Sequence, residues 1–331
     1  MLNNPSFFMF FMSLISGTLI SISSSSWLGM WMGLEMNLLS FIPIINKNST
    51  PYETEAAMKY FLIQTMASVI FLIAVMTSEM MEFSMNTYSP YLISMALLMK
   101  MGVAPFHFWF PGVMEGISWM NCFILMTWQK IAPFILISYK MMNNMLIMVI
   151  FMSTLIGSVG GLNQNSIRKI MSYSSISHLG WMMSAMLVSN NMWMMYFMIY
   201  TLLNLAMINL FHSQSMYQLS QAFFIKNNPL IKFSMMISML SLGGLPPFLG
   251  FLPKWLVIQS LVNQYSFIML LFMVMMTLMT LYFYMRIMFS AFMFMNSELK
   301  WFSNKKSAET ATLSMMISII GIPITTWMIM Y

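Results

Sequence analysis

Residues 102–111 read Gly-Val-Ala-Pro-Phe-His-Phe-Trp-Phe-Pro, and residues 244–253 read Gly-Leu-Pro-Pro-Phe-Leu-Gly-Phe-Leu-Pro. A glycine, a proline, a phenylalanine and a second proline recur at one offset of 142 residues. Both segments interrupt apolar runs, where proline breaks a helix by removing a backbone donor. Matched breaks of this kind are typical of inverted repeats in membrane transporters, although a chance match is the alternative. We therefore expect two helical repeats, each containing one broken helix.

The composition around these segments is that of a membrane protein. Of 331 residues, 60% are hydrophobic and only 7% are charged, against about 25% charged in an ordinary soluble domain. The apolar runs are continuous over about 18 to 25 residues, the length of a membrane helix, whereas barrel strands alternate polar and apolar residues. The expected fold is an all-α polytopic membrane protein with about 11 transmembrane helices.

The apolar runs also predict how the chain is organised. Spans are expected at about 5–22, 27–45, 56–77, 89–111, 117–139, 143–161, 167–188, 192–212, 229–262, 265–291 and 310–329. The breaks fall in the fourth and ninth spans, so the chain crosses the membrane in opposite directions at the two breaks. We expect one membrane domain over 1–331, with a first inverted repeat at about 5–139, a second at about 143–291 and a C-terminal helix at about 310–329.

Scarce residue types exclude several kinds of chemistry. The sequence has one cysteine, Cys122, three histidines and no aspartate. A disulfide framework and a cysteine-ligated iron–sulfur cluster are therefore excluded, as are metal sites built from aspartate. Three histidines cannot supply the four axial ligands of a membrane cytochrome with two haems. We expect no cofactor, metal or nucleotide site in this chain.

The basic residues in the loops predict the orientation in the membrane, because such residues favour the cytoplasmic or matrix side. Loops after even-numbered spans carry seven of them, and the opposite side carries only Lys140. The seven are Lys47, Arg168, Lys169, Lys226, Lys300, Lys305 and Lys306. The bias places the N-terminus on the matrix or cytoplasmic side and the C-terminus on the other. It also accounts for the net charge of +6 without a nucleic-acid partner.

Ionisable residues inside the spans are the candidates for function, because a charge at the bilayer centre costs about 2.5–3.5 kcal/mol on insertion scales. Glu35 lies in the middle of the second span, and we interpret it as a protonatable or charge-pairing site; a packing carboxyl is the alternative. Lys100 lies about 11 residues from either end of its span. It precedes a break at which Pro105 frees the carbonyl of Met101. A lysine that snorkels to the interface is the alternative for Lys100.

Two further lysines lie close to prolines. Lys130 precedes Pro133, which frees the carbonyl of Gln129 and leaves an acceptor beside a buried ammonium. Lys254 follows the second break, and we interpret it as the counterpart of Lys100 in the second repeat. The alternatives are a lysine held only by carbonyls, for Lys130, and one that reaches the far interface, for Lys254.

The third group of candidates is two histidines. His107 lies inside the first break, and His178 lies in the seventh span, 142 residues after a neighbour of Glu35. Buried groups that gain and lose protons form a relay where water links them, and movement of Glu35 relative to Lys100 would switch that lysine between holding and releasing a proton. An imidazole that only accepts or donates a structural hydrogen bond is the alternative. The ten tryptophans and most tyrosines are interpreted as interface anchors or packing residues and not as cofactor contacts.

Five of these segments resemble, in order, the subunit 2 family of mitochondrial NADH:ubiquinone oxidoreductase, respiratory complex I. They are WLGMWMGLEMNLLSF (27–41), KMGVAPFHFW (100–109), TWQKIAP (127–133), YSSISHLGW (173–181) and GLPPFLGFLPKW (244–255). The likeness covers most of the chain to about residue 290. It implies an antiporter-like subunit of the membrane arm, in the mitochondrial inner membrane, with two inverted five-helix repeats.

The resemblance also implies a function as part of an enzyme. Protons would be translocated while other subunits oxidise NADH and reduce ubiquinone, and those subunits would hold the NADH, FMN, iron–sulfur clusters and ubiquinone. Other membrane-arm and accessory subunits and membrane lipids are the implied partners, with the N-terminus on the matrix side. The family's proton-relay positions fall on Glu35, Lys100, Lys130, Lys254, His107 and His178.

Two other functions compete with this one. A stand-alone cation/proton antiporter would need a cation site, and the scarcity of acidic residues inside the spans argues against it. A structural spacer, whose buried charges only hold helices together, predicts that neutral replacement of Lys100 or Lys130 leaves proton transport intact.

Overall fold

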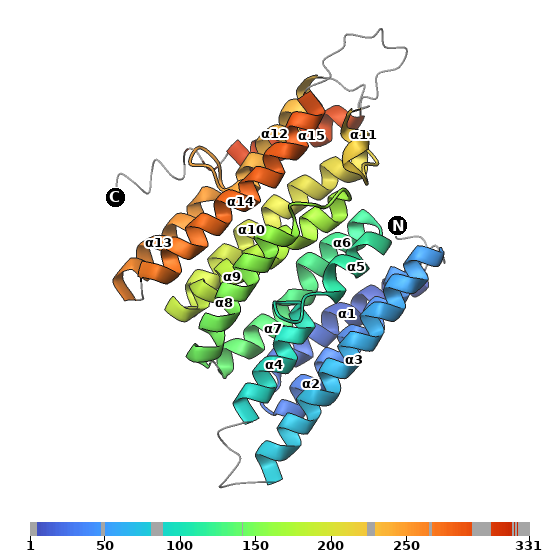
Figure 1. Cartoon of the computed structure of the whole chain (residues 1–331). Coiled ribbons are helices and arrows are strands. Elements are labelled where there is room, and N and C mark those ends of the chain that lie inside the picture. The colour runs from blue at the N-terminus through green and yellow to red at the C-terminus, as the bar shows by residue number, and fades with distance from the viewer. Residues whose placement is uncertain are drawn as a thin grey trace. The chain divides into compact units, whose positions relative to one another are not determined.

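The computed structural model describes residues 5–47, 50–80, 89–140, 142–223, 229–264, 267–292, 306–319, 321 and 323. Within these ranges the chain forms helices and turns, with one isolated β-bridge between Ser166 and Gln218. It divides into two compact units, Met1–Val149 and Ile150–Tyr331, and Figure 1 colours the helices in chain order. The expected all-α fold is confirmed. Lys226, Lys300, Lys305 and residues 320, 322 and 324–329 of the last expected span lie outside the described residues.

The first unit is organised around a close helix pair. Its helices are α1 (Pro5–Ser23), α2 (Trp27–Ile45), α3 (Pro51–Met80), α4 (Ser89–Met101), α5 (Trp109–Gly116), α6 (Trp119–Met126), α7 (Trp128–Tyr139) and the start of α8 (Asn143–Gly160). Helices α1 and α2 touch backbone to backbone, since a Cβ atom on Gly33 would lie 2.5 Å from the amide nitrogen of Ser21. The other neighbours of α2 include α3, which also packs on α4 and α5. Both α2 and α4 therefore pack against α3.

The second unit encloses a polar helix. Its helices are the rest of α8, α9 (Ile167–Val188), α10 (Asn190–Ser213), α11 (Leu219–Phe223), α12 (Pro229–Gly243), α13 (Phe251–Gln264), α14 (Phe267–Phe292) and α15 (Lys306–Ile319). Helix α9 packs against α10, α13 and α14. Most of its residues are buried, including Ser174, Ser175 and Ser177. A helix in the interior of a membrane protein can carry such hydroxyls because protein, and not lipid, surrounds it.

The described helices match the expected spans only in part. Seven spans within the described residues are long and apolar enough to cross a membrane, at 6–23, 27–45, 51–78, 119–139, 143–160, 190–213 and 267–289. The fourth expected span is divided into α4 and α5, and the ninth into α12 and α13. The fifth is also interrupted, at Thr127 between α6 and α7. The total of eleven crossings stays a prediction.

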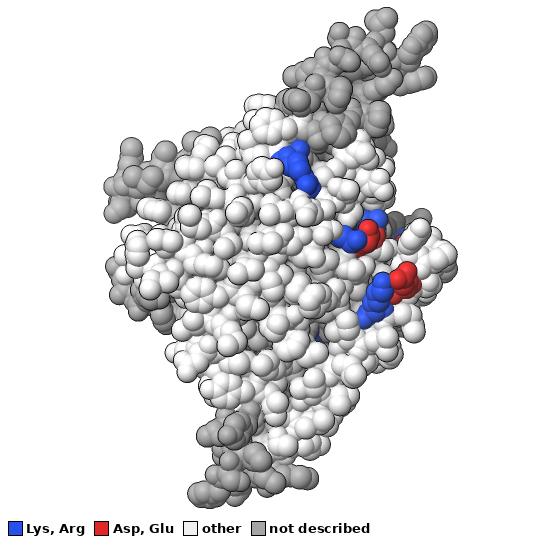
Figure 2. All heavy atoms as spheres, viewed as in Figure 1, with Lys and Arg blue, Asp and Glu red and all other residues white. Residues whose placement is uncertain are grey.

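The surface of the units is apolar, as a lipid-embedded chain requires. Large side chains such as Leu62, Met66 and Val69 on α3 are more than half exposed. On the face in Figure 2, charged side chains are few and lie toward the upper right of the view, and the rest of the described surface is uncharged. One exposed ion pair joins Lys59 and Glu55 on α3, with 2.5 Å between Nζ and Oε1.

Candidate functional site

The first break begins where α4 ends on a glycine in the left-handed conformation. Gly102 has a φ of +69°, which residues with a side chain rarely adopt. The amide of Val103 donates to the carbonyl of Leu98 at 3.2 Å, a bond that closes helix C-termini of this kind. Helix α4 thus ends at Met101, before Pro105. The sequence suggested that Pro105 breaks the helix, but Gly102 already ends it.

Helix α12 ends in the same way at the second break. Gly244 has a φ of +81°, and the amide of Leu245 donates to the carbonyl of Leu240 at 3.3 Å. The glycine and both partners of the bond lie 142 positions after their counterparts at the first break. The sequence match between the two segments is therefore also a match of backbone conformation.

Side chains satisfy carbonyls at the open end of α4. Trp109 Nε1 donates to the carbonyl of Met99 at 3.2 Å, and Gln64 Nε2 donates to the carbonyl of Lys100 at 3.1 Å. Lipid offers no such donors, so backbone acceptors at membrane depth need partners from the protein. Gln64 thereby ties α3 to the residue that carries the buried ammonium.

Glu35 and Lys100 lie together in the first unit. The distance from Lys100 Nζ to Glu35 Oε1 is 4.0 Å, and the side chains are 4% and 22% exposed for Lys100 and Glu35. This distance exceeds that of a direct hydrogen bond, so the groups interact by charge across a gap. The lysine does not snorkel, and the structure brings together the two residues that the sequence suggested as a pair.

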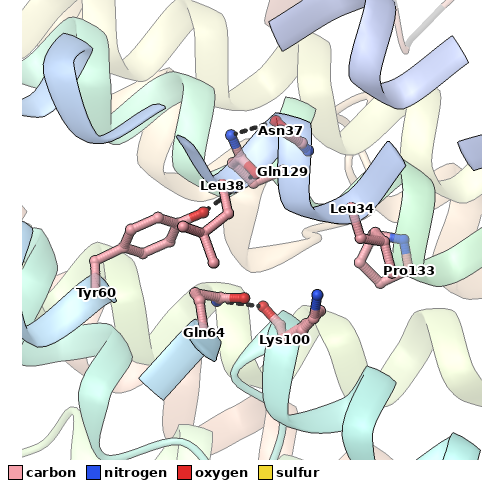
Figure 3. Close-up of a pocket in the computed structure, with 8 residues that line it drawn as sticks. All are labelled: Leu34, Asn37, Leu38, Tyr60, Gln64, Lys100, Gln129 and Pro133. Carbon is pink, nitrogen blue, oxygen red and sulfur yellow. Dashed lines mark hydrogen bonds between the residues drawn. The ribbon is translucent and has the colours of Figure 1, made fainter. Parts of the chain in front are cut away.

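A small cavity lies beside Lys100, with two clusters of polar groups on its wall (Figure 3). The space open to the centre of a water-sized sphere is about 10 Å³, close to what one water molecule requires. On the far side from Lys100, Gln129 Nε2 donates to Asn37 Oδ1 at 3.0 Å, and Tyr60 Oη donates to Gln129 Oε1 at 3.4 Å. The cavity is lined by Leu34, Asn37, Leu38, Tyr60, Gln64, Lys100, Gln129 and Pro133.

Lys130 is the next residue along α7 from Gln129, and only 1% of it is exposed. Its Nζ atom lies 5.0 Å from the centre of the Phe110 ring, within the range of a cation–π contact. Helix α7 therefore contributes the side-chain amide of Gln129 to the cavity wall and the buried ammonium of Lys130 to the first unit.

Lys254 lies at the second break, where it bonds to the end of the preceding half-helix. Its Nζ atom donates to the carbonyl of Gly243 at 2.8 Å, and 6% of the residue is exposed. The position equivalent to Lys254 in the first break is Gly112, since Lys100 precedes its break and Lys254 follows its own. The interpretation of Lys254 as the counterpart of Lys100 is therefore wrong in position, and the lysine does not reach for an interface.

The two candidate histidines lie in different units. His107 lies within the first break, where its Nδ1 is 3.2 Å from the carbonyl oxygen of Pro105 and its ring stacks on Phe108. His178 is buried on α9, and its Nδ1 lies 2.9 Å from the hydroxyl of Tyr196. Each imidazole lies within hydrogen-bond distance of a polar partner. This arrangement agrees both with a proton relay and with a hydrogen bond that is only structural.

Sequence reasoning missed the neutral polar residues of the site. Gln64 and Tyr60 are one helical turn apart on α3, a spacing that could have indicated a polar stripe on one helix face. Their partners lie far away in sequence, so no local pattern predicts them. Arg286 on α14 was also missed. Its guanidinium donates to the carbonyls of Leu162, at 2.6 Å, and Gln164, in the turn after α8.

Comparisons with known proteins agree with this architecture. Residues 24–280 match the family described as NADH:quinone oxidoreductase/Mrp antiporter, TM. NADH-ubiquinone oxidoreductase chain 2 of Anopheles gambiae is 49% identical, over 95% of this chain and 94% of that protein. The protein of the same name from Locusta migratoria is 47% identical, over 97% and 95%. A chain of respiratory complex I from Thermus thermophilus with bound aureothin has the same fold, with a TM-score of 0.84 at 22% identity over 97% of this chain and 78% of that one.

Proposed function

Because the chain belongs to the NADH:quinone oxidoreductase/Mrp antiporter membrane family, we propose that it translocates protons as an antiporter-like membrane-arm subunit of respiratory complex I. It is a multi-pass protein of the mitochondrial inner membrane and forms part of the NADH:ubiquinone oxidoreductase enzyme. NADH oxidation and ubiquinone reduction supply the energy. We assign the NADH, FMN, iron–sulfur clusters and ubiquinone to partner subunits.

The observation that carries this proposal is the pair of the buried Lys100 and the half-buried Glu35, 4.0 Å apart, with Lys100 beside a cavity of the size of one water. A carboxylate close to a buried ammonium favours the charged lysine, and its withdrawal favours release of the proton. A small change in the position of α2 relative to α4 would therefore load or unload Lys100. Water in the cavity would accept the proton that Lys100 releases.

The remaining site residues extend this route. We assign Lys130 as the next proton carrier in the first unit, because it follows Gln129 of the cavity wall. In the second unit we assign His178 as a carrier, and Lys254 as the exit-side carrier at the second break. His107 is assigned to the polar break itself, where it can exchange protons near Lys100.

We propose the same organisation as the sequence predicts. The first inverted repeat spans about 5–139, the second about 143–291, and the last helix about 310–329. The matched glycine conformations at the two breaks support the repeats, and the bias of basic residues supports an N-terminus in the matrix and a C-terminus in the intermembrane space. Other membrane-arm and accessory subunits and lipids would cover the exposed apolar faces.

The decisive experiment compares the native complex with complexes that carry Glu35→Gln or Lys100→Met, in sealed vesicles. Proton uptake per NADH oxidised and the rate of NADH oxidation are measured together, and native gels report assembly. We expect assembled complexes whose proton uptake is lost or sharply reduced, since each change removes a proton-binding group from the pair.

The matched controls are Glu55→Gln and Lys59→Met, which change the same residue types in the exposed ion pair of α3. These variants should keep the native ratio of protons to NADH. If Glu35→Gln and Lys100→Met also kept that ratio in assembled complexes, the buried charges would be structural and the spacer function would be the better description.

A further inference from the structure

The contact surface between α9 and α10 in the second unit is polar, although both helices lie in an apolar protein. The two helices run side by side (Figure 1). We name their facing polar residues the α9–α10 seam. It consists of Ser175 and His178 on α9 and Tyr196, Tyr200 and Asn204 on α10. All five are buried, with at most 7% of each residue exposed.

The members of the seam are in contact with one another. His178 Nδ1 lies 2.9 Å from Tyr196 Oη, and the His178 ring lies 5.2 Å from the ring of Tyr200. Tyr200 in turn lies beside Ser175 and Asn204. Because Tyr196, Tyr200 and Asn204 are spaced by one helical turn, their side chains lie on one face of α10.

A third helix extends the seam. Tyr284 of α14 is 1% exposed and lies beside Ser174 at the other edge of α9. Hydroxyls, an imidazole and an amide thus follow one another across three helices of the same unit. Every hydroxyl in such a row can donate and accept a hydrogen bond, which is the property that proton transfer along the row requires.

Packing alone does not explain these residues. Interhelical hydrogen bonds in a membrane contribute little to stability on average, and phenylalanine would fill the space of Tyr196 equally well. Tyr196 and Tyr200 on α10 therefore add hydroxyls that filling this buried space does not require.

We propose that the α9–α10 seam conducts protons in the second unit, with Tyr196 and His178 exchanging a proton directly. This rests on the proposed function, and it adds tyrosine hydroxyls to a path otherwise made of lysines, histidines and water. Tyr196 receives a proton from a hydroxyl or water beside it and passes its own phenolic proton to His178 Nδ1. His178 releases the proton of Nε2 to an acceptor on its other side. One proton moves across the pair, and both residues end neutral.

The test is Tyr196→Phe in the assembled complex in sealed vesicles, with Tyr282→Phe as the matched control. Tyr282 lies on α14, and 61% of it is exposed, so the control removes a phenol outside the seam. We expect Tyr196→Phe to lower the rate of coupled proton uptake by about a hundredfold, the lower end of the effect of a positioned acid–base group, and Tyr282→Phe to leave it unchanged. Rates in D₂O should show a larger isotope effect for Tyr196→Phe than for the native complex.

A second comparison separates conduction from packing. If Tyr196 and His178 act as one relay, the double variant Tyr196→Phe with His178→Gln should be no slower than His178→Gln alone, as for groups that act as a unit. Tyr200→Phe serves as the second variant if native gels show that Tyr196→Phe does not assemble, and the same direction of change is expected. Native rates and isotope effects in assembled Tyr196→Phe and Tyr200→Phe complexes would refute proton conduction by the seam. If Glu35→Gln lost proton uptake while Tyr196→Phe kept the native rate, the proposed function would stand and only conduction by the seam would be refuted.

Discussion

Lys254 Nζ donates a 2.8 Å hydrogen bond to the carbonyl oxygen of Gly243, the last residue of α12. The ammonium thus lies at the negative end of a helix dipole, where a cation is favoured. Because Lys254 belongs to α13, the bond joins the two halves of the broken helix. Lys254 is therefore a buried charge and also the side chain that joins the two helices across the second break.

Replacement of Lys254 by methionine should destabilise the complex. The carbonyl of Gly243 would lose its donor inside the membrane, at a cost of about 1–3 kcal/mol for an unsatisfied buried group. The temperature of half-inactivation of NADH oxidation in detergent should therefore fall. Lys59→Met, at an exposed position, should change stability by no more than about 0.5 kcal/mol. Equal temperatures of half-inactivation for the two variants would argue against a stabilising bond between Lys254 and Gly243.

The glycines at the breaks should resist replacement by alanine. Gly102→Ala and Gly244→Ala force a side chain into the left-handed region, at about 1–2 kcal/mol. Gly244→Ala should be the worse of the two, because its Cβ would lie 2.9 Å from Lys254 Nζ. Gly112→Ala is the control, since no atom lies within 4 Å of its Cβ and alanine favours the helix. Assembly yield on native gels measures all three.

The amide of Gln129 should matter more than the hydroxyl of Tyr60. Gln129→Leu removes both the bond to Asn37 at 3.0 Å and the bond from Tyr60 at 3.4 Å, whereas Tyr60→Phe removes only the longer one. With about 1 kcal/mol for each hydrogen bond, Gln129→Leu should be the more heat-sensitive complex and the slower in proton uptake. The opposite order would show that the network is not organised around Gln129.

Filling the cavity should slow proton uptake and leave the fold in place. Leu38 is 2% exposed and lines the cavity, and its neighbour Leu39 is 57% exposed on the same helix. Leu38→Phe should exclude water from Lys100 and destabilise by about 1–3 kcal/mol through overpacking. Leu39→Phe makes the same change outside the cavity and should be neutral. Proton uptake per NADH in vesicles distinguishes the two, and a native ratio in Leu38→Phe would contradict a role for cavity water.

Local sequence predicted the breaks because glycine and proline act on their own backbone. The left-handed glycines of both breaks lie where the two matched segments begin. The interruption at Thr127 was not predicted. The only local signal there is Pro133, six residues later in sequence, which lacks a backbone N–H and so frees the carbonyl one turn before itself, but does not specify where α6 stops.

The burial of the lysines was also predictable, since the bilayer penalises charge at any exposed position. Their partners were not, because these depend on which helix faces meet. Gln64 reaches the carbonyl of Lys100 from α3, 36 positions away in sequence. Tyrosine is a packing or anchor residue on composition alone, and only the contact with His178 indicates another role for Tyr196.

The two breaks share a backbone turn and differ in where the cation is attached, before the turn in Lys100 and after it in Lys254. The two breaks therefore present a cation on opposite sides of the same turn, and an exact two-fold relation between the repeats is lost at these lysines. Under the proposed function, the two breaks are thus unlike steps for a proton.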